Sequence, residues 1–338
     1  MAALRRRLGE IFHLEAPPEP GGYRQTLRAA LDVLDHEPSW LRPPDRQGRP
    51  GGLVMLDPAL PTIVVPDLHA RMDFFLCVLG YEAEPGLTAL DLLSQGRLQI
   101  VCLGDGVHAE GRASGRWRSA REEYEEDFAS HYCMDEEMRE SLGVMAMVME
   151  VKSAVPERFH FLKGNHENIT NESGGGNFPF RKFALEGQMV RAYMERFYGE
   201  EVLDLHARFE KELPLLASGH GFLLSHAEPA AFYPRTRLVE YRSNPEVVAG
   251  LTWTDNGDAE PGSVRKMLDH YLSLDEARDG LYFGGHRPAS GGYLLRAEGR
   301  YVQIHDPERF VVAQLPATGR IDLQRDVREI DSRWLLAF

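Results

Sequence analysis

The sequence predicts an α/β fold in which β-sheet is flanked by helices. Short apolar runs rich in β-branched and aromatic residues alternate with stretches of helical periodicity from Thr62 to Leu272. This alternation is typical of a sheet covered by helices. In addition, polar side chains that can bind metal follow these apolar runs directly. We therefore expect a functional site at the carboxyl ends of the strands, where open α/β sheets bind their ligands.

The N-terminal region differs in composition from the rest of the chain. Residues 1–50 are predicted to form a helical extension and a linker rich in proline and glycine. Within them, Tyr23–Leu34 has apolar residues at helical spacing. The stretch RPPDRQGRPGG, at 42–52, is typical of a long loop. Residues 51–338 are predicted to form one larger domain, a size that a single fold can reach.

The apolar runs of this larger domain predict buried strands bounded by glycine or proline. They are Thr62–Val65, Leu98–Leu103, Phe159–Leu162, Phe222–Leu224 and Leu281–Phe283. The helical patterns between and after them are Met72–Leu79, Leu87–Ser94, Met138–Val155, Phe180–Phe197, Val202–Lys211 and Val264–Leu272. Three further strand-like runs, Gly292–Arg296, Tyr301–His305 and Phe310–Leu315, predict an antiparallel meander that closes the sheet.

A long connection separates Asp105 from Asn165. Residues 107–157 are predicted to form an acidic helical insert, because they contain the runs REEYEED and MDEEMRE. One interpretation is a solvated helical excursion, since charge runs usually face water. The other is a lid over the site, since Trp117, Tyr124 and Phe128 give the insert apolar material of its own. The sequence leaves both interpretations open.

The composition excludes several classes of protein. The fractions of apolar residues, 43%, and charged residues, 27%, are typical of a globular enzyme or binding protein. A net charge of −14 disfavours duplex nucleic acid as a partner. Cys77, Cys102 and Cys133 form no disulfide framework, which favours a reducing cytoplasm. No apolar stretch is long enough to cross a membrane, and no signal peptide is recognisable.

Six side chains that can bind metal follow the predicted strands: Asp67, His69, Asp105, Asn165, His226 and His286. Each alone has an ordinary explanation, as a turn residue or a hydrogen-bonded histidine. Together they place carboxylate and amide oxygens and imidazole nitrogens at one edge, without a thiolate. Such a donor set suits Mn, Fe or Zn. It is too large for one open catalytic ion, but it suits two ions that share a carboxylate.

The ordered motifs resemble those of the calcineurin-like metallophosphoesterases, and more closely those of the serine/threonine phosphoprotein phosphatase branch. They read PDLHA at 66–70, LGDG at 103–106, KGNHEN at 163–168, LLSHAEP at 223–229 and GGHRP at 284–288. LTWTD at 251–255 is similar to a further motif of the phosphoprotein phosphatases. The resemblance covers residues 61–288. It implies a sandwich of mixed β-sheets flanked by helices, with a dinuclear metal site at the strand ends.

The resemblance also implies roles for the site residues. The first metal would be held by Asp67, His69 and Asp105. The second would be held by Asp105, Asn165, His226 and His286. Asp105, which would bridge both ions, and His166 are the expected catalytic residues. A hydroxide between the metals would attack phosphorus, and His166 would protonate the leaving alkoxide, while Glu167 would support the loop.

One departure from the family pattern affects the expected substrate contacts. The Asp-Arg-Gly that follows Gly-Asp in the family is replaced here by His108, Ala109 and Glu110. The change removes the aspartate expected to orient His166 and the arginine expected to hold phosphate. Replacement candidates for the phosphate contact are Arg112, Arg181 and Arg287, because a guanidinium group matches phosphate oxygens. Each of the three can equally be an exposed surface arginine.

The predicted function is hydrolysis of a phosphoric ester, with two divalent or trivalent transition-metal ions, Mn, Fe or Zn, as cofactors. A phosphomonoesterase of the serine/threonine protein phosphatase type is expected, with a phosphoprotein or a small phosphate ester as substrate. Hydrolysis of nucleotides or dinucleoside polyphosphates is the first alternative. A non-catalytic scaffold with the same fold is the second, and the complete set of ligands argues against it.

Overall fold

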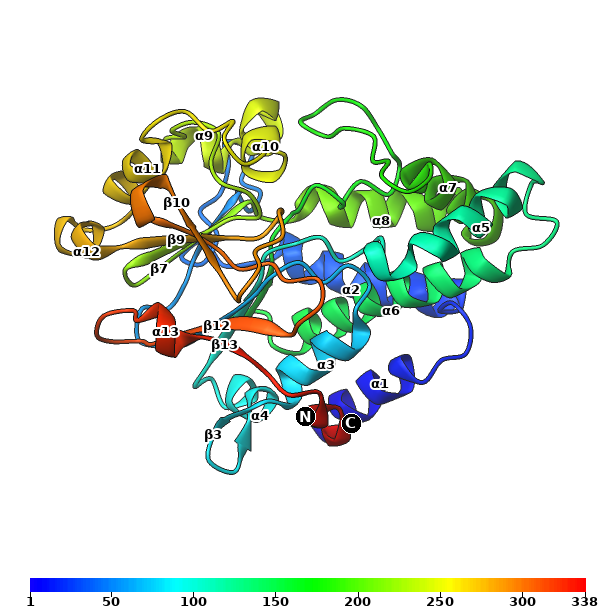
Figure 1. Ribbon diagram of the computed structural model, residues 1–338, viewed down its shortest axis with the longest axis horizontal. Helices are drawn as coiled ribbons and strands as arrows, with labels where there is room; N and C mark the ends of the chain where they lie inside the picture. Colours follow the sequence, from blue (N-terminus) through cyan, green and yellow to red (C-terminus); the bar gives the residue numbers. More distant parts are fainter.

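Two β-sheets pack face to face between layers of helices in the computed structural model, which describes residues 1–338 (Figure 1). The six-stranded sheet contains, in spatial order, β1 (Leu53–Met55), β7 (Leu216–Gly219), β8 (Phe222–Leu224), β9 (Leu281–Gly284), β11 (Tyr301–Gln303) and β10 (Leu294–Arg296). The five-stranded sheet contains β13 (Val327–Glu329), β12 (Val311–Leu315), β2 (Thr62–Val65), β5 (Gln99–Cys102) and β6 (Phe159–Phe161). A small separate sheet pairs β3 (Glu82–Glu84) with β4 (Leu87–Thr88).

Helices cover the outer faces of both sheets. Those on the side of the five-stranded sheet are α1 (Ala2–Phe12), α2 (Pro20–Asp35), α3 (Met72–Gly80), α4 (Ala89–Ser94), α5 (Ser114–Glu125), α6 (Tyr132–Ala154), α7 (Glu186–Tyr193) and α8 (Glu200–Glu212). Those on the side of the six-stranded sheet are α9 (Arg235–Val239), α10 (Pro245–Thr252), α11 (Ser263–Tyr271) and α12 (Leu274–Asp279). The short helix α13 (Leu323–Asp326) precedes β13. No helix is both long enough and apolar enough to cross a membrane.

The strands are continuously apolar because both of their faces are buried. In β2, Val64 packs between the sheets, with residues such as Leu224 and Phe283 of the opposite sheet. Its neighbours Ile63 and Val65 point the other way, into the core that contains the helices. A strand buried on both faces has no polar side to alternate with. This explains why the sequence at 62–65 reads TIVV.

Parallel pairing brings the ends of the central strands together. In the five-stranded sheet, β2 pairs with β5 and β5 pairs with β6, all in parallel. In the six-stranded sheet, β8 pairs with β9 and β9 pairs with β11, also in parallel. The loops that leave these strands therefore emerge at the carboxyl edge of each sheet. These loops carry the predicted metal ligands.

The prediction of a C-terminal antiparallel meander is wrong. Strand β10 is antiparallel to β11, but β11 is parallel to β9. Strand β12 then crosses to the other sheet, where it lies antiparallel to β2. An apolar run of this length fits the interior of either sheet equally well, so its local pattern does not specify its partner.

The N-terminal helices and the long connection after β5 both contribute to the largest hydrophobic core. Leu8 of α1 and Leu27 of α2 are fully buried in it. So are Met138 and Leu142 of α6, and Trp117 of α5. The acidic residues of α5 lie mainly on its exposed surface. The connection thus presents charge outward and packs its apolar side against the rest of the molecule.

Candidate metal centre

The loops after β2 and β5 are tied together by their backbones. The amides of Leu68 and His69 both donate to the carbonyl oxygen of Asp105, at 3.1 and 2.7 Å. His69 and Asp105 adopt left-handed backbone conformations, with φ of 42° and 51°. Non-glycine residues rarely do so, and such strain concentrates at functional sites. The two turns therefore hold the carboxylate of Asp105 and the imidazole of His69 in fixed positions.

Donor atoms from both sheets meet around Asn165, which follows β6. The side-chain oxygen Oδ1 of Asn165 is 2.9 Å from Nε2 of His226 and 2.9 Å from Nδ1 of His286. Nε2 of His226 is also 3.4 Å from Oδ2 of Asp105. His226 follows β8 and His286 follows β9, so the six-stranded sheet supplies both imidazoles. The four residues predicted for the second metal thus form one cluster.

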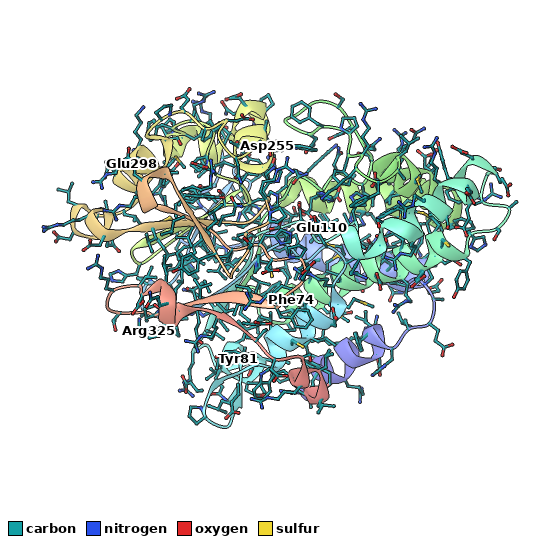
Figure 2. The ribbon with its side chains drawn as sticks, in the orientation of Figure 1. Phe74, Tyr81, Glu110, Asp255, Glu298 and Arg325 are labelled. Carbon is teal, nitrogen blue, oxygen red and sulfur yellow. The ribbon has the colours of Figure 1, made fainter.

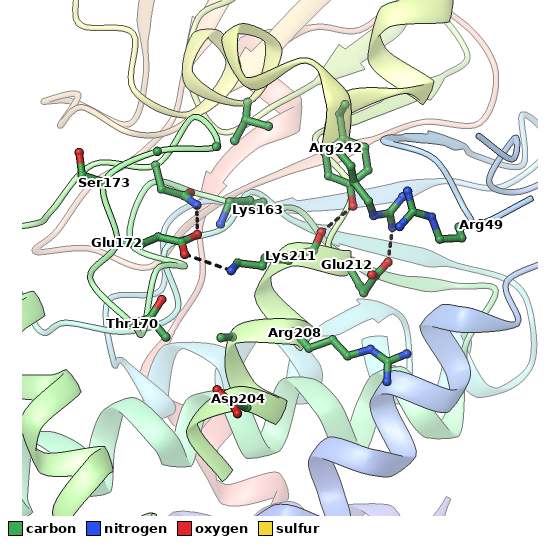
Figure 3. A pocket seen from close by; sticks show the side chains of 16 residues that line it. Arg49, Lys163, Thr170, Glu172, Ser173, Asp204, Arg208, Lys211, Glu212 and Arg242 are labelled. Atoms are coloured by element: carbon green, nitrogen blue, oxygen red, sulfur yellow. Dashed lines mark hydrogen bonds and ion pairs between the residues drawn. The ribbon is translucent and has the colours of Figure 1, made fainter. Parts of the chain in front are cut away.

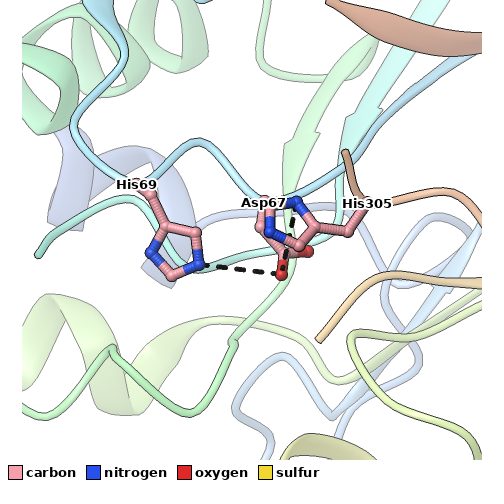
Figure 4. A group of neighbouring side chains, drawn as sticks. All are labelled: Asp67, His69 and His305. Atoms are coloured by element: carbon pink, nitrogen blue, oxygen red, sulfur yellow. Dashed lines mark ion pairs between the residues drawn. The ribbon is translucent and has the colours of Figure 1, made fainter. Parts of the chain in front are cut away.

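A second cluster lies beside the first. Nε2 of His69 is 3.6 Å from Oδ2 of Asp105 and 3.8 Å from Oδ2 of Asp67. Asp67, His69 and His305 also form a group whose ligand atoms all lie within 4.8 Å of one another (Figure 4). Asp105 belongs to both clusters, in the position of a shared carboxylate.

The orientation of the imidazoles suits a cation. His226 donates from Nδ1 to the carbonyl oxygen of Leu103 at 3.1 Å, and His69 donates from Nδ1 to that of His108 at 3.0 Å. Burial lowers the pKa of both histidines, so they are neutral. Their Nε2 lone pairs therefore face other acceptors, the oxygens of Asn165 and Asp105. Acceptors that converge without a proton between them fit a bound metal ion.

The buried carboxylates also favour a bound cation. Burial, followed by the nearby carboxylates of Asp67 and Glu167, raises the pKa of Asp105 well above its ordinary value. Like charges held this close in a dry site destabilise one another unless a cation lies between them. The donor chemistry, oxygen and imidazole nitrogen, fits Mn, Fe or Zn.

Glu167 organises the backbone beneath the site. Its carboxylate accepts from the amides of Asp105 at 2.9 Å, Gly106 at 2.8 Å and Gly164 at 2.6 Å. Gly164 has to be a glycine, because a Cβ there would lie 2.2 Å from Oδ1 of Asp105. These contacts explain the close spacing of Gly, Asn, His and Glu in the motif at 164–167.

Comparison with known proteins supports the fold. No protein-family model matches the sequence, and no curated protein matches it. Among solved structures, the chain is similar to a protein serine/threonine phosphatase from Saccharomyces cerevisiae with similarity to the human phosphatase PP5. The TM-score is 0.51 at 16% identity, over 92% of this chain and 90% of the yeast chain.

The chain shares the fold of this phosphatase, as the resemblance of its motifs predicted.

Two further solved structures are similar at lower scores. One is described as a putative diadenosine tetraphosphatase, with a TM-score of 0.43 at 14% identity, over 83% of this chain and 97% of that chain. The other is a cold-active protein tyrosine phosphatase of a psychrophilic Shewanella species, with a TM-score of 0.47 at 11% identity, over 89% and 84% of the two chains.

His166 has an unexpected partner. Its Nδ1 is 2.9 Å from Nδ1 of His108, the residue that stands where the family has aspartate. Both rings pack on Phe180. Burial, and then the nearby His69 and His108, lower the pKa of His166 well below its ordinary value. The expected loss of an orienting aspartate is thus accompanied by a new histidine pair.

Sequence reasoning missed several residues at this centre. His305 follows β11 and joins Asp67 and His69 (Figure 4). Glu110, which is labelled in Figure 2, pairs with His305. The signal for His305 was present, because the predicted strand 301–305 ends on it. The sequence showed His108 and Glu110 only as replacements of family residues. Their contacts with His166 and His305 depend on the folded structure.

A cavity of about 460 Å³ opens beside His69. Arg112 and Lys182 line it, together with Glu110. Arg112 donates to the carbonyl oxygen of Ala70 at 3.1 Å and pairs with Glu140 at 2.9 Å. Of the three arginines proposed for phosphate, only Arg112 lines this cavity. Arg181 is exposed, and Arg287 pairs with Asp255 of the LTWTD motif.

A larger cavity, about 740 Å³, lies beyond Lys163 and is separate from the metal ligands (Figure 3). Most of its charged side chains take part in ion pairs. Lys211 lies 3.1 Å from Glu172, and Arg242 pairs with Glu212. Paired charges leave few groups free to bind a ligand, so size alone does not make this cavity the reactive centre.

Proposed function

We propose that the chain hydrolyses phosphoric esters at a centre of two transition-metal ions. The observation that carries the proposal is the convergence of neutral imidazoles and buried carboxylates from both sheets on two adjacent positions. Asp67, His69 and Asp105 would hold the first ion. The second would be held by Asp105, Asn165, His226 and His286. When bound, two such ions acidify water and offset the charge on a phosphoryl group.

The protein's own groups would complete the reaction. His166 lies beside the shared carboxylate, with Nε2 3.7 Å from Oδ2 of Asp105. From there it can deliver a proton to the leaving oxygen of a bound ester. His108 holds the other ring nitrogen of His166 and so fixes the direction of the ring. Arg112 and Lys182, which line the adjacent cavity, would attract the phosphate and fix its orientation.

The class of substrate that the enzyme hydrolyses is a second part of the proposal. The LTWTD motif and the order of the other motifs favour a phosphomonoesterase of the serine/threonine protein phosphatase type. One observation favours the alternative, a nucleotide or dinucleoside polyphosphate hydrolase. The neutral His108 replaces an aspartate that would stabilise a protonated His166. A phosphoanhydride leaving group requires less protonation than a serine alkoxide does, so this substitution harms its hydrolysis less.

A substrate panel tests this proposal. Metal-free protein is loaded with Mn and given a serine phosphopeptide, an aryl phosphate and a dinucleoside polyphosphate. We expect hydrolysis of at least one of them, and loss of that activity in Asp105→Asn. If the protein binds two metals but hydrolyses none of the three, it is a scaffold. If it binds no metal, the assignment of the ligands is wrong.

His166→Ala separates chemistry from metal binding. Removal of a general acid costs about 10²–10⁴-fold in rate. We expect a loss in this range for the phosphopeptide and a smaller one for the aryl phosphate, whose leaving group is stable as an anion. Metal content, measured by elemental analysis, should stay that of the unmodified protein. Loss of metal in His166→Ala would show that His166 is a ligand rather than the acid.

A further inference from the structure

His305 is a buried histidine with one unpaired ring nitrogen. It follows β11, is 0% exposed, and its Nδ1 makes no hydrogen bond. A buried polar atom without a partner costs free energy, so its presence calls for an explanation. His305 lies outside all the motifs recognised in the sequence.

The other nitrogen of His305 is held firmly. Nε2 lies 2.9 Å from Oε2 of Glu110, whose second oxygen lies 3.2 Å from the ammonium group of Lys182. The ion pair with Lys182 marks Glu110 as a carboxylate, which accepts a hydrogen bond from Nε2–H of His305. This tautomer leaves the lone pair on Nδ1.

That lone pair faces the first metal position. Nδ1 of His305 lies 3.9 Å from Oδ2 of Asp67, and the same oxygen lies 3.8 Å from Nε2 of His69 (Figure 4). Both imidazoles thus lie within 4 Å of the same carboxylate oxygen. Histidines that bind metal commonly donate their other N–H to a carboxylate, which fixes the ring and raises its basicity. His305 and Glu110 reproduce that arrangement.

We propose that His305 is a further ligand of the first metal ion, through Nδ1, and that Glu110 is the residue that positions it. The inference rests on the proposed two-metal function. The first ion would then have two imidazoles and two carboxylates, from His69, His305, Asp67 and Asp105. More imidazole at a site favours Zn or Fe over Mn. Glu110 stands where the family pattern has glycine, so the His305–Glu110 pair is a property of this chain.

Metal titration of the full-length chain tests the inference without relying on activity. Metal-free protein is titrated calorimetrically with Zn and, separately, with Mn. We expect two ions in the unmodified protein. In His305→Ala, one ion should bind as before and the other at least about 10-fold more weakly. Glu110→Gln should weaken the same ion by about 10–100-fold, because the neutral amide orients the imidazole less well. The loss should be larger for Zn than for Mn.

His160→Ala is the matched control, since it also removes a fully buried histidine but lies next to Lys152, away from the centre. Both ions should bind to it with unchanged affinity. If His305→Ala does not fold, Glu110→Gln, in which His305 remains, decides the question. Unchanged affinity for both ions in the variants would overturn the role of His305 and leave the proposed function intact. Absence of two ions from the unmodified protein would instead overturn both proposals.

Discussion

The replacement of aspartate by His108 alters the environment of the proposed acid. An aspartate would supply negative charge to His166, whereas the deeply buried His108, whose pKa burial lowers to about 3, is neutral. Its contribution is therefore mainly geometric. The backbone amide of His108 is buried and donates a hydrogen bond to Oγ of Ser141, at 3.1 Å. Helix α6, which carries Ser141, thus holds His108 and its pair with His166 in place.

A comparison of two substitutions tests this geometric role. His108→Ala removes the hydrogen-bond partner of Nδ1 of His166, so we expect kcat to fall by up to about 10²-fold, the cost of a misplaced catalytic group. His108→Asn keeps a short hydrogen-bonding side chain near the same point and should recover most of the loss. Steady-state kinetics and metal analysis of both variants provide the measurement. Equal activity of the two variants would exclude a positioning role for His108.

His160, in the middle of β6, should make stability depend on pH. Burial, and then the charge of Lys152, lower the pKa of His160 from 6.5 to about 3. Below about pH 6.5 the unfolded chain binds a proton that the folded chain does not. The contribution of His160 is therefore present above that pH and is lost as the pH falls toward about 3. The slope from this group is about 1.4 kcal/mol per pH unit.

His160→Leu should remove that slope. Urea unfolding at about pH 7 and about pH 5 measures the free energy of unfolding in both proteins. We expect the loss of stability between the two values of pH to be smaller in His160→Leu by about 2 kcal/mol, an upper bound set by the slope over this interval. An equal loss in both proteins would show that His160 already binds a proton in the folded state.

The site residues show what a single sequence can predict. Asp67, Asp105 and Asn165 were accessible because each comes directly after an apolar strand, and parallel strands end at the same edge. His305 obeys the same rule but has no motif around it. The His108–His166 contact joins residues that are 58 positions apart. No local pattern encodes such a contact, because it depends on how two loops pack.

At the scale of elements, helix α6 supports the turn that carries His108. Glu137 of α6 is fully buried and accepts from the amide of Ala109 and from Oγ of Ser141, both at 3.0 Å. Its other oxygen pairs with Arg116 of α5. A helix of 23 residues thus connects the core to the turn beside the metal centre. The two interpretations from sequence, a solvated excursion and a lid, did not include such a supporting role.

Glu137→Ala should therefore affect both stability and turnover. It leaves the amide of Ala109 without a partner and removes the buried carboxylate that pairs with Arg116. Loss of one member of a buried ion pair costs about 3–5 kcal/mol. Arg116 keeps its contact with Glu140, at 2.7 Å, so we expect the lower end of this range. Thermal or urea unfolding measures the stability, and kcat should fall because His108 loses its support.

Glu136→Ala is the control for this substitution. Glu136 also pairs with Arg116, at 3.4 Å, but its side chain is 48% exposed. An exposed pair contributes only about 0–1 kcal/mol. Equal effects of Glu136→Ala and Glu137→Ala would contradict a specific role for the buried carboxylate.

The C-terminal strands mark a limit of prediction at this scale. Strands β11 and β12 were both expected as strands, but their partners could not be predicted. The segment between them passes from one sheet to the other. Because the interior of the sandwich and the outer faces are all apolar, hydrophobicity cannot distinguish the two sheets.

At the scale of the whole molecule, the proposed metal centre would join the two sheets. Asp67, Asp105 and Asn165 follow strands of the five-stranded sheet, whereas His226 and His286 follow strands of the six-stranded sheet. A metal ion held by both groups would act as a cross-link through the edge of the sandwich. Since the unfolded chain does not preserve this arrangement, the ions would bind mainly to the folded state.

Metal binding should consequently stabilise the entire fold. An ion at about 100 times its Kd adds about 2.7 kcal/mol per site to the free energy of unfolding. We expect added Mn or Zn to raise Tm, and a chelator to reverse the rise.

His226→Ala removes a donor that the six-stranded sheet contributes, so much of this gain should disappear. His160→Leu, which changes a buried histidine outside the centre, should keep the full gain. Thermal unfolding of the three proteins with and without metal decides the matter. If metal raised Tm equally in His226→Ala, His226 would not be a metal ligand, and its part in linking the two sheets would be excluded.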